Sequence, residues 1–271
     1  MWKTSISDNR EYPSFCESAS KDDFLFSSFK TNPIYNRILE HTHLQYGFAY
    51  AQKLYERLGS IEEFKRIVKL ASINDVHGGC ILMSFDLGNE VIKVSPSTLR
   101  YIKVAFDLVD LIGENTKNKT ICEIGGGYGG QCVVFNSIFG FKKWDILDLK
   151  EVNMLQMRYL SENKIENASA TCLGEDLDIL DSYDLVISNY AFSECKRDIQ
   201  EHYMNKVLRN SSHGYMTMNF CWNNEEQGDG WCEDNGFVNM YTVEELIENI
   251  PPIKIEKEYP QTHPKNILLK W

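Results

Sequence analysis

Five glycines within six consecutive positions are the feature of this sequence that carries the most chemical information. They stand in the segment Ile121-Cys-Glu-Ile-Gly-Gly-Gly-Tyr-Gly-Gly-Gln131, between an apolar run and a second apolar run of helical character. Glycine permits a tight turn at the end of a strand, and it lets main-chain N–H groups approach a ligand closely. The segment therefore predicts a nucleotide-like cofactor at the first strand-to-helix turn of a doubly wound sheet.

The glycines by themselves leave two cofactors open. Gly125, Gly127 and Gly129 fit the G-x-G-x-G loop of enzymes that use S-adenosylmethionine (SAM). With Gly130 as the third glycine, the same loop fits the dinucleotide pattern G-x-G-x-x-G, so an NAD-dependent oxidoreductase is the alternative. Glu123 favours SAM, because a carboxylate at the strand end attracts the methionine ammonium and repels an anionic pyrophosphate.

Acidic residues after the next two predicted strands are candidates for holding the nucleoside. Asp148 follows the second strand, where a carboxylate can bind the ribose diol through two hydrogen bonds; the alternative is an ordinary acidic residue at a strand end. Glu175 or Asp176 follows the third strand and could accept a hydrogen bond from the adenine amino group. The stretch 175–181 fits a solvated acidic loop equally well.

The segment Ser188-Asn-Tyr-Ala-Phe-Ser-Glu194 follows the fourth predicted strand. It should face the transferring methyl group, because the carboxyl ends of the strands form the ligand crevice of an open α/β sheet. Glu194 is a candidate base for an acceptor hydroxyl, or else a carboxylate that opens the next helix and is stabilised by its dipole. His263, on the loop of the last hairpin, is the second candidate base, with a solvated loop histidine as the alternative.

Four further residues are candidates for binding the acceptor. Arg100, next to Tyr101, could bind a phosphate or carboxylate, or it could pair with an acidic surface residue. His77 lies in a glycine-flanked loop that could fold over the site or simply form a turn, and Tyr190 could orient the acceptor. A sugar hydroxyl needs a base, whereas an anionic acceptor needs a cation such as Arg100, and the sequence leaves this choice open.

The predicted cofactor contacts come from the glycine segment and from the ends of the next three strands. They are Glu123, Gly125, Gly127, Tyr128, Gly129, Gln131, Asp148, Leu149, Glu175, Asp176, Ser188 and Asn189. The acidic pair Asp176 and Asp178 falls in the predicted adenine loop, and the cysteines and histidines show no spacing typical of zinc. We therefore expect no metal site.

Residues 1–95 are predicted to form a helical cap that precedes the cofactor-binding domain. Up to Asn32 the chain is polar with scattered aromatics and is expected to be irregular. Apolar residues then recur at helical spacing over 33–58, and a capping box that starts at Ser60 predicts the next helix. The stretch 74–79 is predicted to be a loop.

Residues 96–271 are predicted to form one α/β domain. Strands and helices alternate from residue 120, which predicts a parallel sheet with helices on both faces. The predicted strands are 120–124, 144–148, 169–173, 184–188 and 214–220, and the predicted helices between them are 130–139, 151–163 and 194–209. Two more strands, 253–259 and 266–271, are joined by a short loop and must pair antiparallel. A doubly wound, Rossmann-like sheet of seven strands with a terminal antiparallel hairpin is the architecture of class I SAM-dependent methyltransferases.

Composition narrows the class of partner. The chain has 271 residues and a formal net charge of −11, which argues against nucleic acid and anionic membranes because both need a basic face. Its eight cysteines include no CxxC pair, and no apolar stretch has the form of a signal peptide or the length of a membrane span. We expect a cytoplasmic protein with reduced thiols and a small-molecule substrate, and leave its oligomeric state open.

A set of motifs spread over residues 95–271 occurs together in one known family. The motifs are Ser95–Tyr101, Glu123–Gln131, Leu147–Leu149 with Tyr159-Leu160, Ile187–Glu194, Gly214-Tyr215, Pro260-x-Thr262 and Asn266–Trp271. They resemble the sugar O-methyltransferases of bacterial surface-polysaccharide gene clusters. The resemblance implies SAM as methyl donor, S-adenosylhomocysteine as product, and a saccharide or activated capsule precursor as acceptor. A non-catalytic SAM-binding partner of a biosynthetic complex is the remaining alternative.

Overall fold

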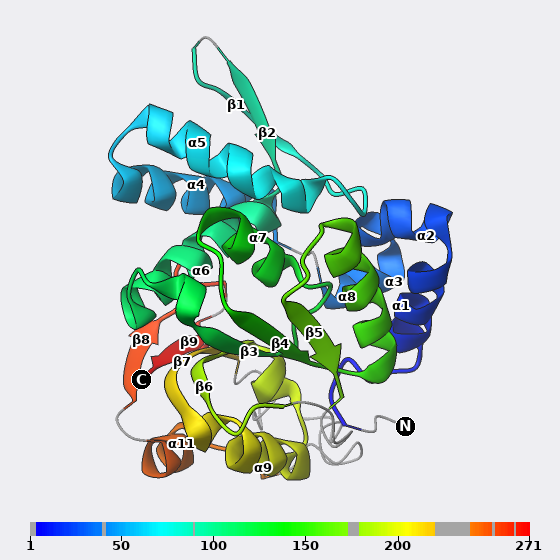
Figure 1. Cartoon of the computed structure of the whole chain (residues 1–271), viewed down its shortest axis with the longest axis vertical. Helices are drawn as coiled ribbons and strands as arrows, with labels where there is room; N and C mark the ends of the chain where they lie inside the picture. Colours follow the sequence, from blue (N-terminus) through cyan, green and yellow to red (C-terminus); the bar gives the residue numbers. More distant parts are fainter. Residues whose placement is uncertain are drawn as a thin grey trace.

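A seven-stranded sheet forms the centre of the protein (Figure 1). The computed structural model describes residues 4–39, 42–88, 90–172, 179–219, 239–250, 253–262 and 264–271. The strands are β3 (Thr120–Ile124), β4 (Lys143–Leu147), β5 (Ala168–Thr171), β6 (Tyr183–Asn189), β7 (Ser211–Met218), β8 (Lys254–Lys257) and β9 (Ile267–Lys270). Their spatial order is β5-β4-β3-β6-β7-β9-β8.

The pairing within this sheet confirms the predicted fold class. Strands β3 to β7 run parallel, whereas β9 pairs antiparallel with both β7 and β8. The chain therefore ends in the predicted antiparallel hairpin, and Trp271 exchanges two backbone hydrogen bonds with Gly214 of β7. From β3 the chain proceeds to β4 and β5 on one side and returns to β6 and β7 on the other. This reversal creates a crevice at the carboxyl ends of β3 and β6.

Helices cover both faces of the sheet (Figure 1). Helices α6 (Pro96–Ile112), α7 (Gly130–Ile138) and α8 (Lys150–Glu162) pack on one face, and α9 (Arg197–Lys206) and α11 (Val243–Asn249) pack on the other. Ser95 caps α6 by accepting a hydrogen bond from the Thr98 N–H, with Pro96 in the first turn, as predicted. Thr242 and Glu245 form the predicted capping box of α11.

The prediction of irregular structure up to Asn32 is wrong. The segment contains α1 (Glu11–Lys21) and α2 (Asp23–Ser28), followed by a short 3-10 turn over Phe29–Thr31. Four of the five buried residues of α1 follow a helical spacing that the polar composition obscured: Tyr12, Phe15, Cys16 and Ala19. They join the same core as residues of the sheet and of α8, because a narrow apolar stripe suffices to hold a surface helix.

The predicted helix over 33–58 is in fact two helices, α3 (Pro33–Ile38) and α4 (Leu44–Leu58). The break occurs at Leu39, which adopts extended backbone, and α4 ends at Gly59 as expected. Helix α5 (Ile61–Ala71) follows its predicted cap, and the predicted loop begins with a 3-10 turn over Ser72–Asp75.

A β-hairpin that the sequence did not predict follows this turn. Strands β1 (Met83–Asp86) and β2 (Val91–Val94) pair antiparallel and project beyond α4 and α5 (Figure 1). Its buried residues pack with α4, α5, α6 and α7. The division of the chain at residue 95 stays a prediction. Among the described helices, none has both the length and the apolar composition that crossing a membrane requires.

Candidate active site

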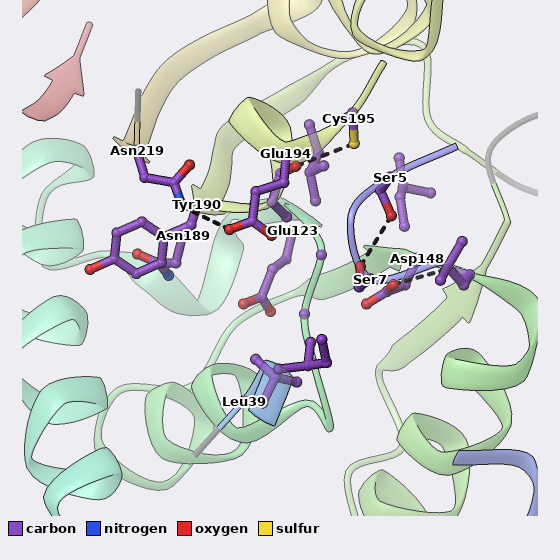
Figure 2. A pocket seen from close by; sticks show the side chains of 18 of the residues that line it. Ser5, Ser7, Leu39, Glu123, Asp148, Asn189, Tyr190, Glu194, Cys195 and Asn219 are labelled. Carbon is purple, nitrogen blue, oxygen red and sulfur yellow. Dashed lines mark hydrogen bonds between the residues drawn. The ribbon is translucent and has the colours of Figure 1, made fainter. Parts of the chain in front are cut away.

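A cavity of about 560 Å3 lies at the carboxyl ends of the central strands. This volume is within the range of about 300–1,000 Å3 that is typical of small-molecule sites. Its walls come from the glycine segment after β3, from the ends of β4 and β6, and from the N-terminal helices. Figure 2 shows Glu123, Asp148 and Glu194 around this cavity, each contributed by a different element.

Most of the predicted site residues line the cavity. These are Glu123, Gly125, Gly127, Asp148, Leu149 and Asn189 from the predicted cofactor contacts, and Arg100, Tyr101, Tyr190 and Glu194 from the predicted acceptor side. Three others, Glu175, Asp176 and His263, lie outside the described residues. Their predicted roles stay predictions.

The glycines of the loop adopt backbone conformations that other residues avoid. Gly125, Gly127 and Gly129 have φ values of +72°, +60° and +90°, all in the left-handed region. A side chain on Gly125 would collide with Ala191, and a Cβ on Gly127 would lie 2.9 Å from Leu39 Cδ1. The loop can therefore present bare main chain to the cavity, which is what close approach of a ligand requires.

Glu123 is a buried carboxyl group in the cavity wall, with 3% of its surface exposed. The indole Nε1 of Trp144 donates a hydrogen bond to its Oε2 at 3.0 Å. Burial raises the pKa of Glu123 to about 7, although the bond from Trp144 acts in the opposite direction. A ligand cation in the cavity would stabilise the ionised form of this group.

Asp148 is held by backbone N–H groups and by a side-chain amide. The Leu149 N–H donates to Oδ1 at 2.8 Å, and Gln156 Nε2 donates to Oδ2 at 2.9 Å. Burial raises the pKa of Asp148 to about 6, and these hydrogen bonds moderate the rise. Gln156 also donates to the Gly127 carbonyl at 2.8 Å, so this buried amide couples the carboxylate to the loop. Sequence reasoning missed Gln156, because its position on α8 alone does not indicate which way the amide points.

Glu194 projects into the cavity beside Asn219 (Figure 2). It ends the 3-10 turn Ala191–Glu194, so the prediction that it opens the next helix is wrong; α9 starts only at Arg197 because Cys195 and Lys196 adopt extended backbone. Asn219 Nδ2 donates to Glu194 Oε1 at 2.7 Å. Burial raises the pKa of Glu194 to about 7, and the bond from Asn219 lowers it in part.

The orientation of Asn219, which the sequence did not suggest, is set by a neighbouring hydroxyl. Ser193 Oγ donates to Asn219 Oδ1 at 2.8 Å, so the amide nitrogen faces Glu194. Asn219 directly follows β7, next to the residues that follow β6. The signal that could have found it is its place at the carboxyl end of the strand beside Glu194.

Tyr190 has an unusual backbone conformation, with φ at +72°. Its N–H donates to the Thr217 carbonyl at 2.8 Å, and its hydroxyl donates to Glu258. The guanidinium of Arg100 lies over its ring, 5.1 Å from the centroid. A non-glycine residue at positive φ is costly, and such strain concentrates at functional sites.

The N-terminal segment crosses the cavity near Glu194. Ser5 forms an isolated β-bridge with Cys195, the Ile6 N–H donates to the Glu194 carbonyl at 3.1 Å, and Lys196 N–H donates to the Thr4 carbonyl at 3.0 Å. Thr4, Ser5 and Ser7 line the cavity, and Ser7 lies on the Asp148 side of it (Figure 2). Because this segment was predicted to be irregular, its part in the site was missed.

Five predicted site residues do not line the cavity. Four of them are buried next to residues of its wall: Tyr128, Gly129, Gln131 and Ser188. Gln131 Nε2, for instance, donates to the Tyr101 carbonyl at 3.1 Å and so ties α7 to α6. His77 packs between the rings of Phe26 and Tyr159, with centroids 5.8 and 6.3 Å away. The structure therefore does not bring His77 together with Arg100.

No known family description and no curated protein matches this sequence. Among solved structures, the chain is similar to geranyl diphosphate C-methyltransferase from Streptomyces coelicolor A3(2), with 13% identity over 64% of this chain and 80% of that one and a TM-score of 0.47. It is also similar to an rRNA methylase from Streptococcus thermophilus, with 13% identity, coverage of 62% and 92%, and a TM-score of 0.41.

A third similar structure is a candidate sarcosine dimethylglycine methyltransferase from Galdieria sulphuraria, with 21% identity and a TM-score of 0.37. The match covers 45% of this chain, and it spans 46% of the length of that protein. Likenesses of this size accompany a shared fold and carry no argument about a reaction or a substrate.

Proposed function

We propose that this protein is a SAM-dependent methyltransferase that acts on an oxygen of a small-molecule acceptor. The observation that carries the proposal is the arrangement of the glycine loop, Glu123 and Asp148 around one cavity at the carboxyl ends of β3 and β4. The acceptor class that the sequence resemblance implies is a saccharide hydroxyl, or a phosphate-type oxygen linked to a sugar or nucleotide, in surface-polysaccharide synthesis.

Each part of the cofactor has a suited partner in this arrangement. The Glu123 carboxylate suits the methionine ammonium, and Asp148, held by Gln156, suits the ribose diol. The backbone of Gly125 and Gly127 suits the part of the cofactor between its ammonium and its ribose, because neither glycine has a side chain of its own to keep a ligand away. An anionic pyrophosphate would lie against Glu123 instead, which disfavours a dinucleotide.

The reaction asks two things of the protein. When bound, SAM supplies an electrophilic methyl group on a sulfonium, so the chain must align the acceptor oxygen with the methyl carbon. For a hydroxyl acceptor, the proton must leave that oxygen as the new bond to carbon forms. Glu194 is suited to accept it, because a base with a pKa near the working pH is the most effective.

Calorimetric titration with S-adenosylhomocysteine and with NAD tests the cofactor directly. We expect micromolar binding of S-adenosylhomocysteine and none of NAD. If NAD binds and S-adenosylhomocysteine does not, the proposal is wrong and the oxidoreductase alternative stands.

We expect Asp148→Ala to weaken S-adenosylhomocysteine binding by roughly tenfold or more. The change removes charge-assisted hydrogen bonds to the ribose, worth about 1.5–3 kcal/mol in total. Gln156→Leu is the matched variant, since it leaves the carboxylate but removes the donor to its Oδ2, and a smaller loss is expected. Unchanged affinity in folded Asp148→Ala would contradict the ribose role.

The affinity for S-adenosylhomocysteine should also depend on pH through Glu123. Its carboxyl group has a pKa of about 7 in the free protein, and a bound ammonium would lower that pKa. Binding therefore requires loss of a proton below pH 7, so affinity should fall by up to about tenfold per pH unit below pH 7. Above pH 7 it should hold as long as the ammonium of the ligand keeps its proton. In Glu123→Gln the fall that starts near pH 7 should disappear, and calorimetry across this pH range checks both curves. A wild-type affinity that rises on acidification would contradict this assignment.

A further inference from the structure

Arg100 stands out among the arginines of this protein. It is partly buried, it lines the cavity, and its guanidinium lies over the Tyr190 ring. Among the described residues, no carboxylate lies within ion-pair distance of it and no hydrogen-bond acceptor engages its nitrogens. A guanidinium carries five N–H donors, and withdrawing it from water without an acceptor is costly.

Other arginines with an aromatic neighbour show what Arg100 lacks. Each stacks on a ring and also binds a carboxylate: Arg57 with Asp110 at 2.6 Å, Arg158 with Asp23 at 2.5 Å and Arg197 with Glu245 at 2.8 Å. In those three cases the charge is neutralised within the protein. Arg100 keeps its fork of donors available to a ligand in the cavity.

Glu258, a buried carboxylate that interacts electrostatically with Arg100, is bound by other donors. Glu258 accepts a hydrogen bond from the Tyr190 hydroxyl through Oε1. Its Oε2 accepts from the N–H and the hydroxyl of Thr262 at 3.1 and 2.8 Å, and from Asn266 Nδ2 at 3.0 Å. Glu258 therefore holds the Tyr190 ring beneath the guanidinium and acts on its charge from beyond ion-pair distance.

The place of Arg100 along the sheet separates it from the nucleoside end of the cavity. The strand order puts Asp148 at the end of β4, Glu123 on β3 and Tyr190 after β6, with neighbouring strands about 4.8 Å apart. Figure 2 shows Asp148 and Tyr190 on opposite sides of the cavity with Glu123 between them. If the ribose and the ammonium lie at Asp148 and Glu123, Arg100 faces what lies beyond the cofactor.

We infer that the acceptor carries an anionic oxygen group, a phosphate or a carboxylate, which Arg100 binds. A guanidinium fork matches both groups through two parallel N–H···O bonds, and stacking on Tyr190 fixes its plane. The rings of Tyr46, Tyr50 and Tyr101 line the same cavity and offer apolar surface to the rest of the acceptor. This inference rests on the proposed function, because it assigns the other end of the cavity to SAM.

The test uses inorganic phosphate, glucuronate and glucose as probes, titrated by calorimetry with and without saturating S-adenosylhomocysteine. We expect phosphate or glucuronate to bind the wild-type protein with a dissociation constant on the order of 1 mM, and glucose not to bind. Binding of phosphate but not of glucuronate indicates a phosphate on the acceptor. Binding of glucuronate but not of phosphate indicates a carboxylate. Arg100→Gln should weaken the anion by at least tenfold without changing the affinity for S-adenosylhomocysteine.

Arg57→Gln is the matched control. Arg57 also stacks on a ring, that of Phe106 at 4.9 Å, but it is paired with Asp110 and does not line the cavity, so its loss should leave anion binding unchanged. Arg100→Lys, which keeps the charge and loses the fork, should give an intermediate affinity and guards against misfolding of the glutamine variant.

Three results would overturn the inference. One is that neither anion binds the wild-type protein, and another is that Arg100→Gln binds the anion normally. The third is that Arg100→Gln loses affinity for S-adenosylhomocysteine. The anionic group that Arg100 binds would then be the carboxylate of the cofactor and not a group of the acceptor. Failure of the proposed function gives a different result from failure of this inference. If the proposed function is wrong, the wild-type protein does not bind S-adenosylhomocysteine, whereas the anion titrations without S-adenosylhomocysteine still report on Arg100.

Discussion

Glu194→Gln is expected to lower the rate of methyl transfer by at least about a hundredfold while S-adenosylhomocysteine binds as before. General base catalysis typically contributes about 10²–10⁴-fold, and glutamine keeps the shape of the side chain but cannot accept the proton. The Asn219 amide can still donate to the glutamine oxygen, so the surrounding hydrogen bonds survive. Single-turnover rates at saturating SAM, with calorimetry as the control for binding, measure the effect.

The pH profile separates a base from a residue that merely supports the fold. The base acts when ionised, so the wild-type rate should rise with pH and level off above the pKa of Glu194, which is about 7. Asn219→Ala removes a donor that lowers this pKa, so the rise should move to higher pH. If the midpoint of the pH–rate profile is the same in Asn219→Ala as in the wild-type protein, Glu194 is not the titrating group.

His263→Ala belongs in the same experiment, because His263 was the other predicted base and lies outside the described residues. If only His263→Ala lowers the rate of methyl transfer, His263 and not Glu194 is the base. If both variants turn over the true acceptor at normal rates, no base is needed. An already anionic acceptor oxygen, bound near Arg100, would then be the better account.

Gly127→Val is expected to abolish binding of S-adenosylhomocysteine. Gly127 has φ at +60°, a conformation that a β-branched residue strongly disfavours, and its Cβ would lie 2.9 Å from Leu39 Cδ1. Either the loop shifts or the valine projects into the space that the cofactor would use. Calorimetry measures the loss, and circular dichroism checks the fold.

Gly59→Val is the matched control for backbone strain. Gly59 has φ at +70°, follows the last residue of α4, has open space where a Cβ would stand, and does not line the cavity. Gly59→Val should lower the free energy of unfolding and leave the affinity for S-adenosylhomocysteine unchanged. Normal binding by a folded Gly127→Val variant would mean that this loop does not hold the cofactor.

Local pattern was a good guide wherever the relevant contacts are short-range. The glycine segment, the alternation of strands and helices, and the caps at Ser95 and Thr242 are local signals, and the structure has the elements they predicted. The narrow apolar stripe of α1 was also local, but its polar remainder concealed it. The break at Leu39 was missed because the apolar residues on its two sides continue a helical spacing.

The sheet with its terminal hairpin and the glycine loop that lines the cavity could be predicted from the sequence alone, because strand alternation and glycine conformation follow from neighbours along the chain. The pKa values of the carboxylates could not be predicted in this way, because the groups that shift them come together only in the folded protein. Gln156 reaches Asp148, Asn219 reaches Glu194 and Glu258 reaches Tyr190 across separate elements. Burial by these same elements raises the pKa values of both Glu123 and Glu194, and burial is a property of packing that no stretch of sequence carries alone.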